Sequence, residues 1–218
     1  MIRLHHVAFS RSFRILWLLE EMGLSCDIAN YQIGDGSLRS PEFLAISPAG
    51  RVPALEVDGR VIFESGAIVE YLCETRPEHG LGRLPGDAER VAFHEWMGFA
   101  ETQASILASL NLQQVFLRAP AKPSAAVLKL ETARLAATLK ILDQHLKGRR
   151  WLLNTGFSAV DTMMGYNVLA APYYVHMDRF EHLNAYIERF AERPAFVRAR
   201  ERDGEQQFYS KPFYPIEG

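Results

Sequence analysis

Two serines at the start of a predicted helix are the first candidates for chemistry. Ser10 and Ser12 stand at the beginning of the apolar-periodic segment 12–22. A serine here is typical of an N-cap, whose side-chain oxygen accepts a hydrogen bond from an unpaired backbone N–H. The position also suits an anion such as a thiolate, because a helix N-terminus carries about half a positive charge and a hydroxyl can donate to the anion. The residues alone leave both interpretations open.

Two further segments carry residues that suit ligand binding. Pro53 precedes the predicted strand 54–57, where a proline is tolerated because no ladder donor is needed, and a cis bond before it would indicate function. Ser65 is predicted to cap a helix, and the free N–H groups at that helix start can bind a carboxylate. Glu64, directly before it, can hold an ammonium group. Together they would grip the zwitterionic end of an amino acid, and simple capping is the alternative.

Other motifs indicate structure rather than catalysis. Ser158 and Asp161 have the spacing of a capping box, with Asp in place of the usual Glu. Cys26 and Cys73 are most simply small core residues. The seven histidines show no H-x-x-x-H spacing, and the chain has neither a G-x-G-x-x-G motif nor a P-loop. We therefore predict no metal site and no nucleotide site.

The elements that must position these residues fall into two parts. Before residue 76 the hydrophobic pattern predicts the order β-α-β-α-β-β-α, with Asp58-Gly59 as a hairpin turn. The expected strands are 2–7, 26–33, 54–57 and 61–63, and the expected helices are 12–22, 41–46 and 65–74. The first helix is apolar over so much of its circumference that it should lie buried between layers.

A break in composition separates this α/β part from a helical part. The segment 76–87, RPEHGLGRLPGD, contains five Gly or Pro residues in twelve and is typical of a linker. After it, apolar residues recur at helical spacing, and Pro194 is suited to the first position of one more helix. Residues 88 to about 202 are therefore predicted to form a bundle of long amphipathic helices.

Composition excludes several classes of protein. The chain has 218 residues, 48% hydrophobic and 23% charged, which is too apolar for intrinsic disorder. Its net charge of -2 does not fit a nucleic-acid-binding protein. Its longest charge-free stretches, 102–117 and 162–177, are shorter than the roughly 20 residues of a membrane span. With two cysteines and no visible secretory signal, we expect a soluble cytoplasmic protein.

Three short motifs occur together in order: Ser10-x-Ser12-x-Arg14, Arg51-Val52-Pro53-Ala54-Leu55 and Glu64-Ser65-Gly66-Ala67-Ile68. Through them the sequence resembles the cytosolic glutathione transferases, and the Ser158–Asp161 box matches a fourth signature of that family. The likeness is to bacterial, serine-type members with a Theta- or Phi-like active site. It implies an α/β thioredoxin-like, glutathione-binding domain over residues 1–80 and an all-α helical-bundle domain over residues 87–218 that contributes the electrophile site.

The resemblance also implies roles for individual residues. Ser10 matches the serine that stabilises the glutathione thiolate, and Ser12 is a second candidate. The implied glutathione-binding residues are Arg51, Val52, Pro53, Glu64 and Ser65, with Glu101 reaching the γ-glutamyl amine across a dimer interface. The second substrate is expected near Asn111, Phe116 or Tyr166.

The implied activity is conjugation of the glutathione thiolate to hydrophobic electrophiles, a detoxification reaction, by a homodimer with glutathione as co-substrate and no metal. Two alternatives stay open: a non-catalytic ligand-binding or interaction protein of this fold, and a glutathione-dependent isomerase of Zeta type.

The sequence departs from the family in places. No tyrosine precedes Tyr31, which excludes the tyrosine-dependent mechanism, and no cysteine lies at the first helix. Ser47-Pro48 replaces the more usual Asn-Pro.

Overall fold

The computed structural model describes residues 1–216, and its contacts divide them into two compact units. Unit 1 consists of Met1–Arg90 together with Ala191–Gln207, and unit 2 consists of Val91–Phe190 together with the chain from Phe208 onward. The contacts therefore group the last helix with the α/β part, whereas the sequence placed it with the other helices.

Unit 1 is built on a four-stranded sheet in the order β2-β1-β3-β4. Its strands are β1 (Arg3–His6), β2 (Asp27–Asn30), β3 (Ala54–Val57) and β4 (Arg60–Phe63). The central β1 is parallel to β2 and antiparallel to β3, and β3 pairs antiparallel with β4 through the Asp58-Gly59 turn. All four predicted strands are confirmed, with shorter bounds for the first two.

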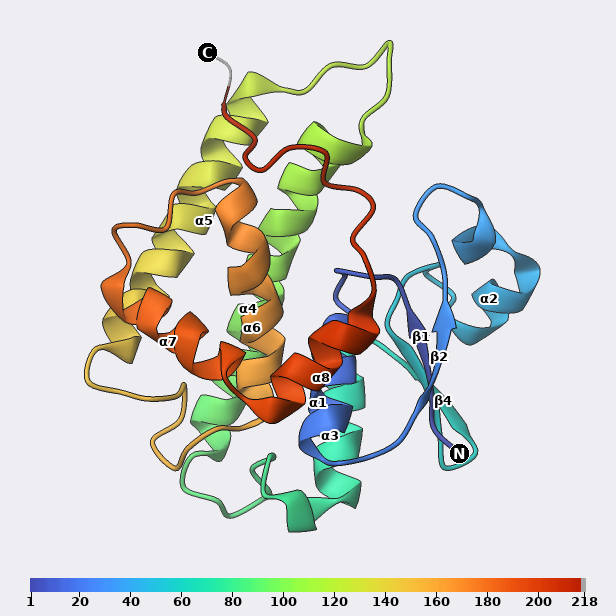
Figure 1. Cartoon of the computed structure of the whole chain (residues 1–218), viewed down its shortest axis with the longest axis vertical. Helices are drawn as coiled ribbons and strands as arrows, with labels where there is room; N and C mark the ends of the chain where they lie inside the picture. Colours follow the sequence, from blue (N-terminus) through green and yellow to red (C-terminus); the bar gives the residue numbers. More distant parts are fainter. Residues whose placement is uncertain (217–218) are drawn as a thin grey trace. The chain divides into compact units, whose positions relative to one another are not determined.

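Helices cover both faces of this sheet. Its helices are α1 (Phe13–Glu21), α2 (Pro41–Ile46), α3 (Ser65–Thr75) and α8 (Pro194–Asp203), with short 3-10 turns at Ser37–Arg39 and Pro77–His79. In Figure 1, α1 and α3 lie on one side of the sheet and α2 on the other. The elements of residues 1–75 thus follow the predicted order and form the expected thioredoxin-like arrangement.

Helix α1 is buried on all sides, as its apolar circumference predicts. It contacts β1 and α3, and α8 packs against it from elsewhere in the sequence. The ring of Phe196 on α8 meets the rings of Phe13 and Trp17 edge to face, with centroids 5.7 and 4.9 Å apart. Such aromatic pairs contribute about 0.5–1.5 kcal/mol beyond their buried area, so they fix α8 firmly on α1.

Ion pairs reinforce the docking of α8. The guanidinium of Arg193 donates to both carboxylate oxygens of Glu21, at 2.7 and 2.6 Å. Arg198 and Arg202 bind Glu20 at 2.8 and 2.6 Å. Burial raises the pKa of Glu20, but hydrogen bonds from the two arginines outweigh it and leave this pKa below its ordinary value. The end of α8 is therefore held at a defined place beside α1 and β1.

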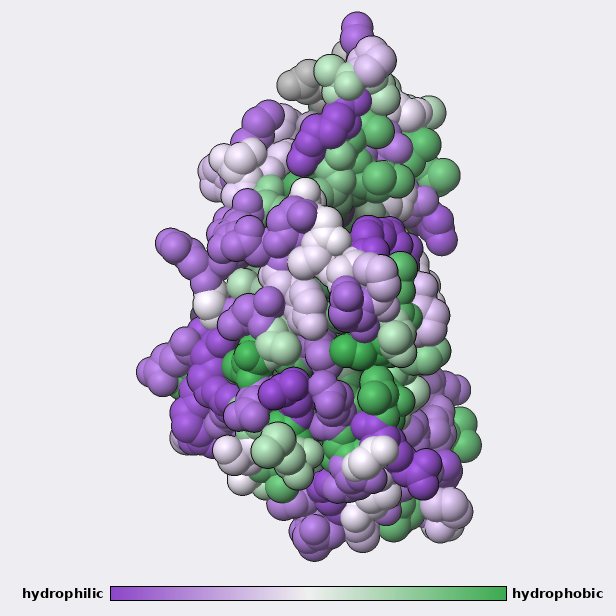
Figure 2. All heavy atoms as spheres, turned by 90° about the vertical axis from the view of Figure 1, so that its right-hand side faces the viewer, coloured by the Kyte–Doolittle hydropathy of each residue, from purple (hydrophilic) through white to green (hydrophobic). Residues whose placement is uncertain are grey.

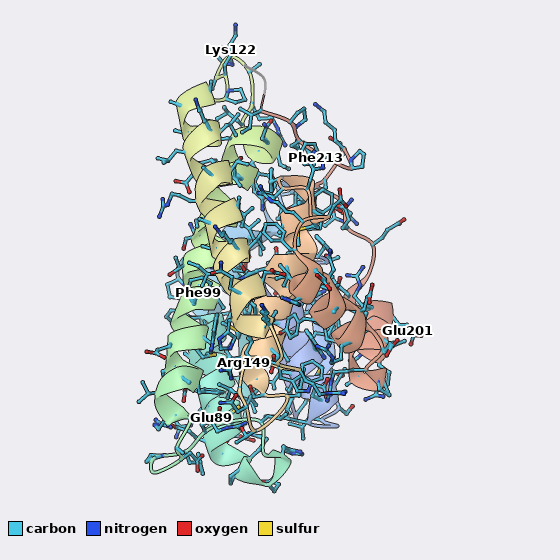
Figure 3. All side chains as sticks on the ribbon, turned by 90° about the vertical axis from the view of Figure 1, so that its left-hand side faces the viewer. Glu89, Phe99, Lys122, Arg149, Glu201 and Phe213 are labelled. Carbon is cyan, nitrogen blue, oxygen red and sulfur yellow. The ribbon has the colours of Figure 1, made fainter. Side chains whose placement is uncertain are left out.

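Unit 2 is helical, as predicted. Its helices are α4 (Arg90–Asn111), α5 (Ala125–Leu146), α6 (Ala159–Ala170) and α7 (Glu181–Ala191), with a π-helical turn at Leu112–Phe116 and a 3-10 turn at Ala171–Tyr173. Helix α6 is buried along almost its whole length and forms the centre of this unit. Figure 3 shows Phe99 on α4, Arg149 just after α5, and Lys122 in the loop that leads into α5.

Length and hydropathy decide whether a helix can cross a lipid bilayer. Among residues 1–216, none of the helices combines the length and the apolar composition that a bilayer crossing requires. On the face drawn in Figure 2, hydrophobic residues lie scattered among hydrophilic ones.

Candidate active site

The register of the sheet brings the three candidate segments of unit 1 to one end. His5 at the end of β1 pairs with Ala54 at the start of β3, and Ala54 pairs with Phe63 at the end of β4. The loop that leaves β1, the turn that enters β3 and the residues that follow β4 therefore emerge from the same edge. These three loops carry the predicted serines, the proline and the acidic residue.

Ser10 and Ser12 lie side by side in the loop between β1 and α1. Their Oγ atoms are 2.8 Å apart, and Ser10 Oγ also accepts a hydrogen bond from the Ser12 backbone N–H at 3.2 Å. Ser10 retains 9% exposure, whereas Ser12 is completely buried. Of the two candidates, Ser10 is the one that keeps some exposed surface.

The predicted capping role is wrong for Ser12. Ser12 occupies the N-cap of α1, but its side chain makes no capping hydrogen bond. Its Oγ instead contacts the backbone N–H and carbonyl of Val7 at 3.2 Å each and His6 Nδ1 at 2.8 Å. Partners at the end of β1 take the bonds that a helix cap would use.

Val52 and Pro53 enter β3 through a cis peptide bond. Val52 is buried and packs with Val7 and Phe43, so the turn rests against the loop that follows β1. Arg51 is exposed beside it, and its carbonyl accepts a hydrogen bond from the Ser47 hydroxyl at 2.8 Å. The predicted segment is thus folded as a buried turn with one exposed cation.

Glu64 and Ser65 begin α3 differently from the prediction. Glu64 is the N-cap residue, with φ 72° and an exposed side chain, and Ser65 is the first helical residue. Capping by Ser65 is therefore wrong. Its buried Oγ accepts a hydrogen bond from Arg14 Nη1 of α1 at 3.4 Å. Arg14, itself fully buried, brings a positive charge beneath the start of α3; the sequence motif contained this residue, but its role was missed.

The remaining predicted residues lie in unit 2. Glu101 stands on α4, half-buried, and its predicted contact with glutathione stays a prediction. Of the residues predicted near the second substrate, Asn111 accepts hydrogen bonds from the hydroxyls of Tyr174 and Tyr209 at 2.5 and 2.8 Å. Tyr166 is buried and Phe116 is half-buried.

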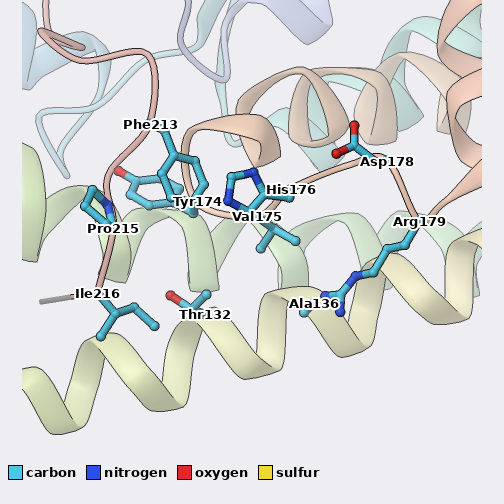
Figure 4. Close-up of a pocket in the computed structure, with 10 residues that line it drawn as sticks. All are labelled: Thr132, Ala136, Tyr174, Val175, His176, Asp178, Arg179, Phe213, Pro215 and Ile216. Atoms are coloured by element: carbon cyan, nitrogen blue, oxygen red, sulfur yellow. The ribbon is translucent and has the colours of Figure 1, made fainter. Parts of the chain in front are cut away.

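A cavity of about 470 Å³ lies within unit 2. Figure 4 shows that Thr132 and Ala136 of α5 form one wall, while Tyr174 and His176 line the opposite side with Phe213 of the C-terminal segment. Asn111, Phe116 and Tyr166 do not line it. The role predicted for those three residues stays a prediction.

The cysteines do not contribute a nucleophile. Both are buried and free. Burial raises the pKa of Cys26 and raises that of Cys73 to about 12, so both thiols stay protonated at neutral pH. Among the described residues, no group of three or more His, Cys, Asp or Glu side chains is arranged to hold a metal ion.

A buried histidine and a buried aspartate adjoin the two serines, and no sequence motif points to either residue. His6 Nδ1 lies 2.8 Å from Ser12 Oγ. On its other side, Nε2 lies 3.0 Å from the carbonyl oxygen of Asp203 and 3.3 Å from its carboxylate. Because 197 residues separate them, no local spacing links His6 to Asp203, and only the docking of α8 brings them together.

The chain is similar to known proteins in sequence and in fold. Residues 1–74 match the family described as glutathione S-transferase, N-terminal domain. Glutathione S-transferase F10 of Arabidopsis thaliana is 32% identical, over 70% of this chain and 73% of that protein.

Two solved structures are similar over almost the whole chain. The glutathione transferase of Methylococcus capsulatus is 26% identical, covers 93% of this chain and 98% of its own, and superimposes with a TM-score of 0.81. A sphingomonad glutathione S-transferase complexed with glutathione is 25% identical, covers 92% and 98%, and gives a TM-score of 0.80. From these matches and from the thioredoxin-like sheet followed by helices, the chain belongs to the glutathione S-transferase family.

Proposed function

We propose that this glutathione transferase uses Ser10 to stabilise the thiolate of glutathione for attack on hydrophobic electrophiles. The observation that carries the proposal is the position of Ser10, which keeps 9% exposure at the edge of the sheet from which the Pro53 turn and the Glu64–Ser65 segment also emerge. A hydroxyl, a backbone turn, and a carboxylate beside a helix N-terminus, all at one edge of the sheet, suit a small zwitterionic thiol.

The binding groups suit the parts of glutathione. The exposed carboxylate of Glu64 would hold the γ-glutamyl ammonium. The carboxylate beside it would meet the N-terminus of α3 at Ser65 and the buried charge of Arg14, and both favour an anion. The Val52 backbone would pair with the cysteinyl unit, and Arg51 would help to bind the peptide. This arrangement directs the sulfur toward Ser10.

The energetics of thiol ionisation are within reach of these groups. A free thiol has a pKa of about 8.5, and lowering it by about 2 units requires about 2.7 kcal/mol of preference for the anion. A charge-assisted hydrogen bond contributes about 1.5–3 kcal/mol, and a helix N-terminus about 0.3–1 kcal/mol. Ser10 at the start of α1 supplies both.

The proposal extends to the assembly and its setting. We infer a cytoplasmic homodimer in which Glu101 of one subunit reaches the γ-glutamyl amine bound by the other. The two free cysteines are consistent with a reducing compartment. The electrophile is proposed to be apolar.

The test is to measure the thiol pKa of glutathione bound to Ser10→Ala, using the ultraviolet absorbance of the thiolate as the signal. We expect the pKa to rise and conjugation of an electrophilic aromatic halide to fall by at least tenfold, with retention on immobilised glutathione preserved. Ser40→Ala is the matched control, because Ser40 caps α2 by accepting the Phe43 N–H at 3.2 Å and should leave the thiol unchanged. Unchanged conjugation in Ser10→Ala would disprove the role of Ser10. Failure of the wild type to bind glutathione would instead favour a non-catalytic protein of this fold.

A further inference from the structure

We propose that Ser12, His6 and Asp203 form a proton relay that takes the thiol proton of glutathione from Ser10 and holds it on His6. This inference rests on the proposed role of Ser10 as the group that contacts the sulfur. It adds a destination for the proton and a reason for the second, buried serine.

The hydrogen-bond partners of His6 fix the polarity of the chain. Nε2 faces the carbonyl oxygen of Asp203 at 3.0 Å and its carboxylate Oδ1 at 3.3 Å. Both oxygens accept, so Nε2 carries the hydrogen of the neutral ring. Nδ1 is then an acceptor, and the Ser12 hydroxyl, 2.8 Å away, donates to it.

This polarity continues to Ser10. Ser12 Oγ accepts the N–H of Val7 at 3.2 Å, and its own hydrogen has two acceptors, His6 Nδ1 at 2.8 Å and the more distant Val7 carbonyl at 3.2 Å. With that hydrogen donated to either acceptor, Ser12 Oγ accepts the hydroxyl hydrogen of Ser10 at 2.8 Å. Ser10 Oγ then accepts a hydrogen bond from the Ser12 N–H with one lone pair, and its second lone pair can accept one from a thiol S–H. In this resting state Ser10 cannot donate to a thiolate. The chain must reverse before its hydroxyl can stabilise the anion.

Proton transfer along the chain achieves that reversal. The S–H bond of glutathione breaks and its proton binds Ser10 Oγ, while the hydroxyl proton of Ser10 moves to Ser12 Oγ and that of Ser12 moves to His6 Nδ1. Each serine ends with one hydrogen, the sulfur becomes a thiolate, and the imidazole becomes an imidazolium. Afterwards His6 donates to Ser12, Ser12 donates to Ser10, and Ser10 donates to the thiolate. All three bonds are made in both states.

The surroundings offset the charge that arrives on His6. The ring is fully buried, where an uncompensated cation is costly, and the Asp203 carboxylate lies against its Nε2. The other Asp203 oxygen binds Arg200 at 2.9 Å, and the Phe9 N–H donates to both oxygens at 3.2 and 3.3 Å. Among the described residues, the charged side chains with ion pairs in this chain of bonds are Asp203 and Arg200 of α8.

The position of Asp203 supports a role beyond stability. It is the last residue of α8, where the negative end of the helix dipole disfavours an acidic side chain by about 0.3–1 kcal/mol. The carboxylate is nevertheless kept there, almost fully buried, with its oxygens on His6 and the loop that carries the serines.

The neighbouring residue on β1 provides a matched control. His5 is also buried, and its Nε2 contacts the Glu56 carboxylate at 2.9 Å while Nδ1 contacts the Tyr31 hydroxyl at 2.9 Å. Because successive residues of a strand point to opposite faces and His6 faces Ser12, His5 faces away from it. It has the same kind of partners as His6 without access to the relay.

The first experiment counts protons in the wild-type protein and needs no variant. Binding of glutathione and of S-methylglutathione, which lacks the thiol proton, is measured by calorimetry in buffers of different ionisation enthalpy, with the thiolate quantified by its ultraviolet absorbance. With the relay, thiolate forms while its proton stays in the protein, so the two ligands release equal numbers of protons. Release of one additional proton per thiolate would overturn the proposal.

The second experiment breaks the relay without touching the ligand. Ser12→Ala removes the bridge, and His6→Asn keeps an acceptor for Ser12 that cannot take up a proton. Both should raise the thiol pKa of bound glutathione by about one unit, a tenfold loss of thiolate relative to thiol, while the affinity for S-methylglutathione stays unchanged. Ser12→Thr, which restores the hydroxyl, and His5→Asn should keep the wild-type pKa.

The outcomes separate this inference from the proposed function. If wild-type protein forms no thiolate, the role of Ser10 fails as well. If thiolate forms and depends on Ser10 but not on Ser12 or His6, the relay alone is wrong. Equal pKa shifts in His5→Asn and His6→Asn would indicate a general effect of strand β1 and would also overturn the relay.

Discussion

Among residues 1–216, each unit contains one buried aspartate, and the two aspartates are held in contrasting ways. Asp161 lies in the first turn of α6 in unit 2 and is completely buried. It accepts hydrogen bonds from the backbone N–H groups of Ser158 and Leu152 at 2.8 and 3.2 Å and from the Tyr186 hydroxyl at 2.9 Å. Burial nevertheless raises the pKa of Asp161 to about 6. Its backbone partners lie within nine residues and close a capping box that starts the helix.

Asp203 of unit 1 has partners of another kind. It ends α8, and it binds His6 and the Phe9 N–H across 197 and 194 residues of sequence. Asp161 helps its own helix to begin, whereas Asp203 is carried by its helix to a loop with two serines. Equal burial therefore does not imply equal purpose: Asp161 binds backbone groups close to it in sequence, whereas Asp203 ties the end of α8 to β1 and to the loop that carries the serines.

The largest effect is expected from removing the carboxylate in unit 2. Asp161→Ala leaves two buried backbone donors and the Tyr186 hydroxyl without their acceptor, at about 1–3 kcal/mol each, so the free energy of unfolding should fall by about 4 kcal/mol. Chemical denaturation measures it. Asp143→Ala, which removes the acceptor of the Leu183 N–H, should cost about 1 kcal/mol. A loss for Asp161→Ala no greater than for this control would contradict the comparison.

The corresponding change in unit 1 should act on the chemistry rather than on stability. Asp203→Asn keeps an acceptor for Phe9 and the backbone carbonyl that binds His6, but removes the charge that offsets an imidazolium. We expect about tenfold less thiolate on bound glutathione, or about 1.4 kcal/mol, with a loss of unfolding free energy near 1 kcal/mol. A thiolate titration and a denaturation curve on the same sample measure the two effects. A loss of stability without a loss of thiolate would show that Asp203, like Asp161, acts on stability alone.

A smaller effect is expected from the serine that begins the capping box. Ser158→Ala should lower the free energy of unfolding by about 1 kcal/mol, because the box loses its hydroxyl while the Asp161 carboxylate keeps its other donors. Ser124→Ala is the matched control for an exposed cap, since Ser124 accepts the Val127 N–H of α5 at 3.4 Å. The thiol pKa of bound glutathione should not change in either variant.

The smallest effect concerns the pH dependence of α8 docking. The arginine partners hold the folded-state pKa of Glu20 below the unfolded value, so its stabilisation is present above pH 4.5 and is lost as the pH falls through the lower, folded-state pKa. Glu20→Gln should therefore be less stable than wild type at neutral pH, and the difference should shrink on acidification. Denaturation curves from pH 7 to pH 3 measure the trend; a difference that grows in acid would contradict it.

Much of unit 1 follows from local pattern. The apolar-rich run at β1, the Asp58-Gly59 turn and the apolar circumference of α1 predict the type and order of these elements, because each depends on neighbours in sequence. The predicted bounds are too long for β1 and β2. The Ser158–Asp161 box was predicted for the same reason and is confirmed. Where a hydroxyl had a distant partner, the prediction failed: Ser12 bonds the end of β1 instead of capping α1, and Ser65 meets Arg14 instead of capping α3.

The order of the elements, the family motifs at Ser10, Pro53 and Glu64, and the lack of a cysteine at the first helix can all be read from the amino-acid sequence. The folded chain is needed to show that Ser10 keeps more exposed surface than Ser12, and that His6 and Asp203 lie behind Ser12. The physical reason is range: periodicity and capping act over a few residues, whereas α8 is bound to α1 by packed rings and by ion pairs to Glu20 and Glu21 nearly two hundred residues away, and that docking places Asp203 against His6.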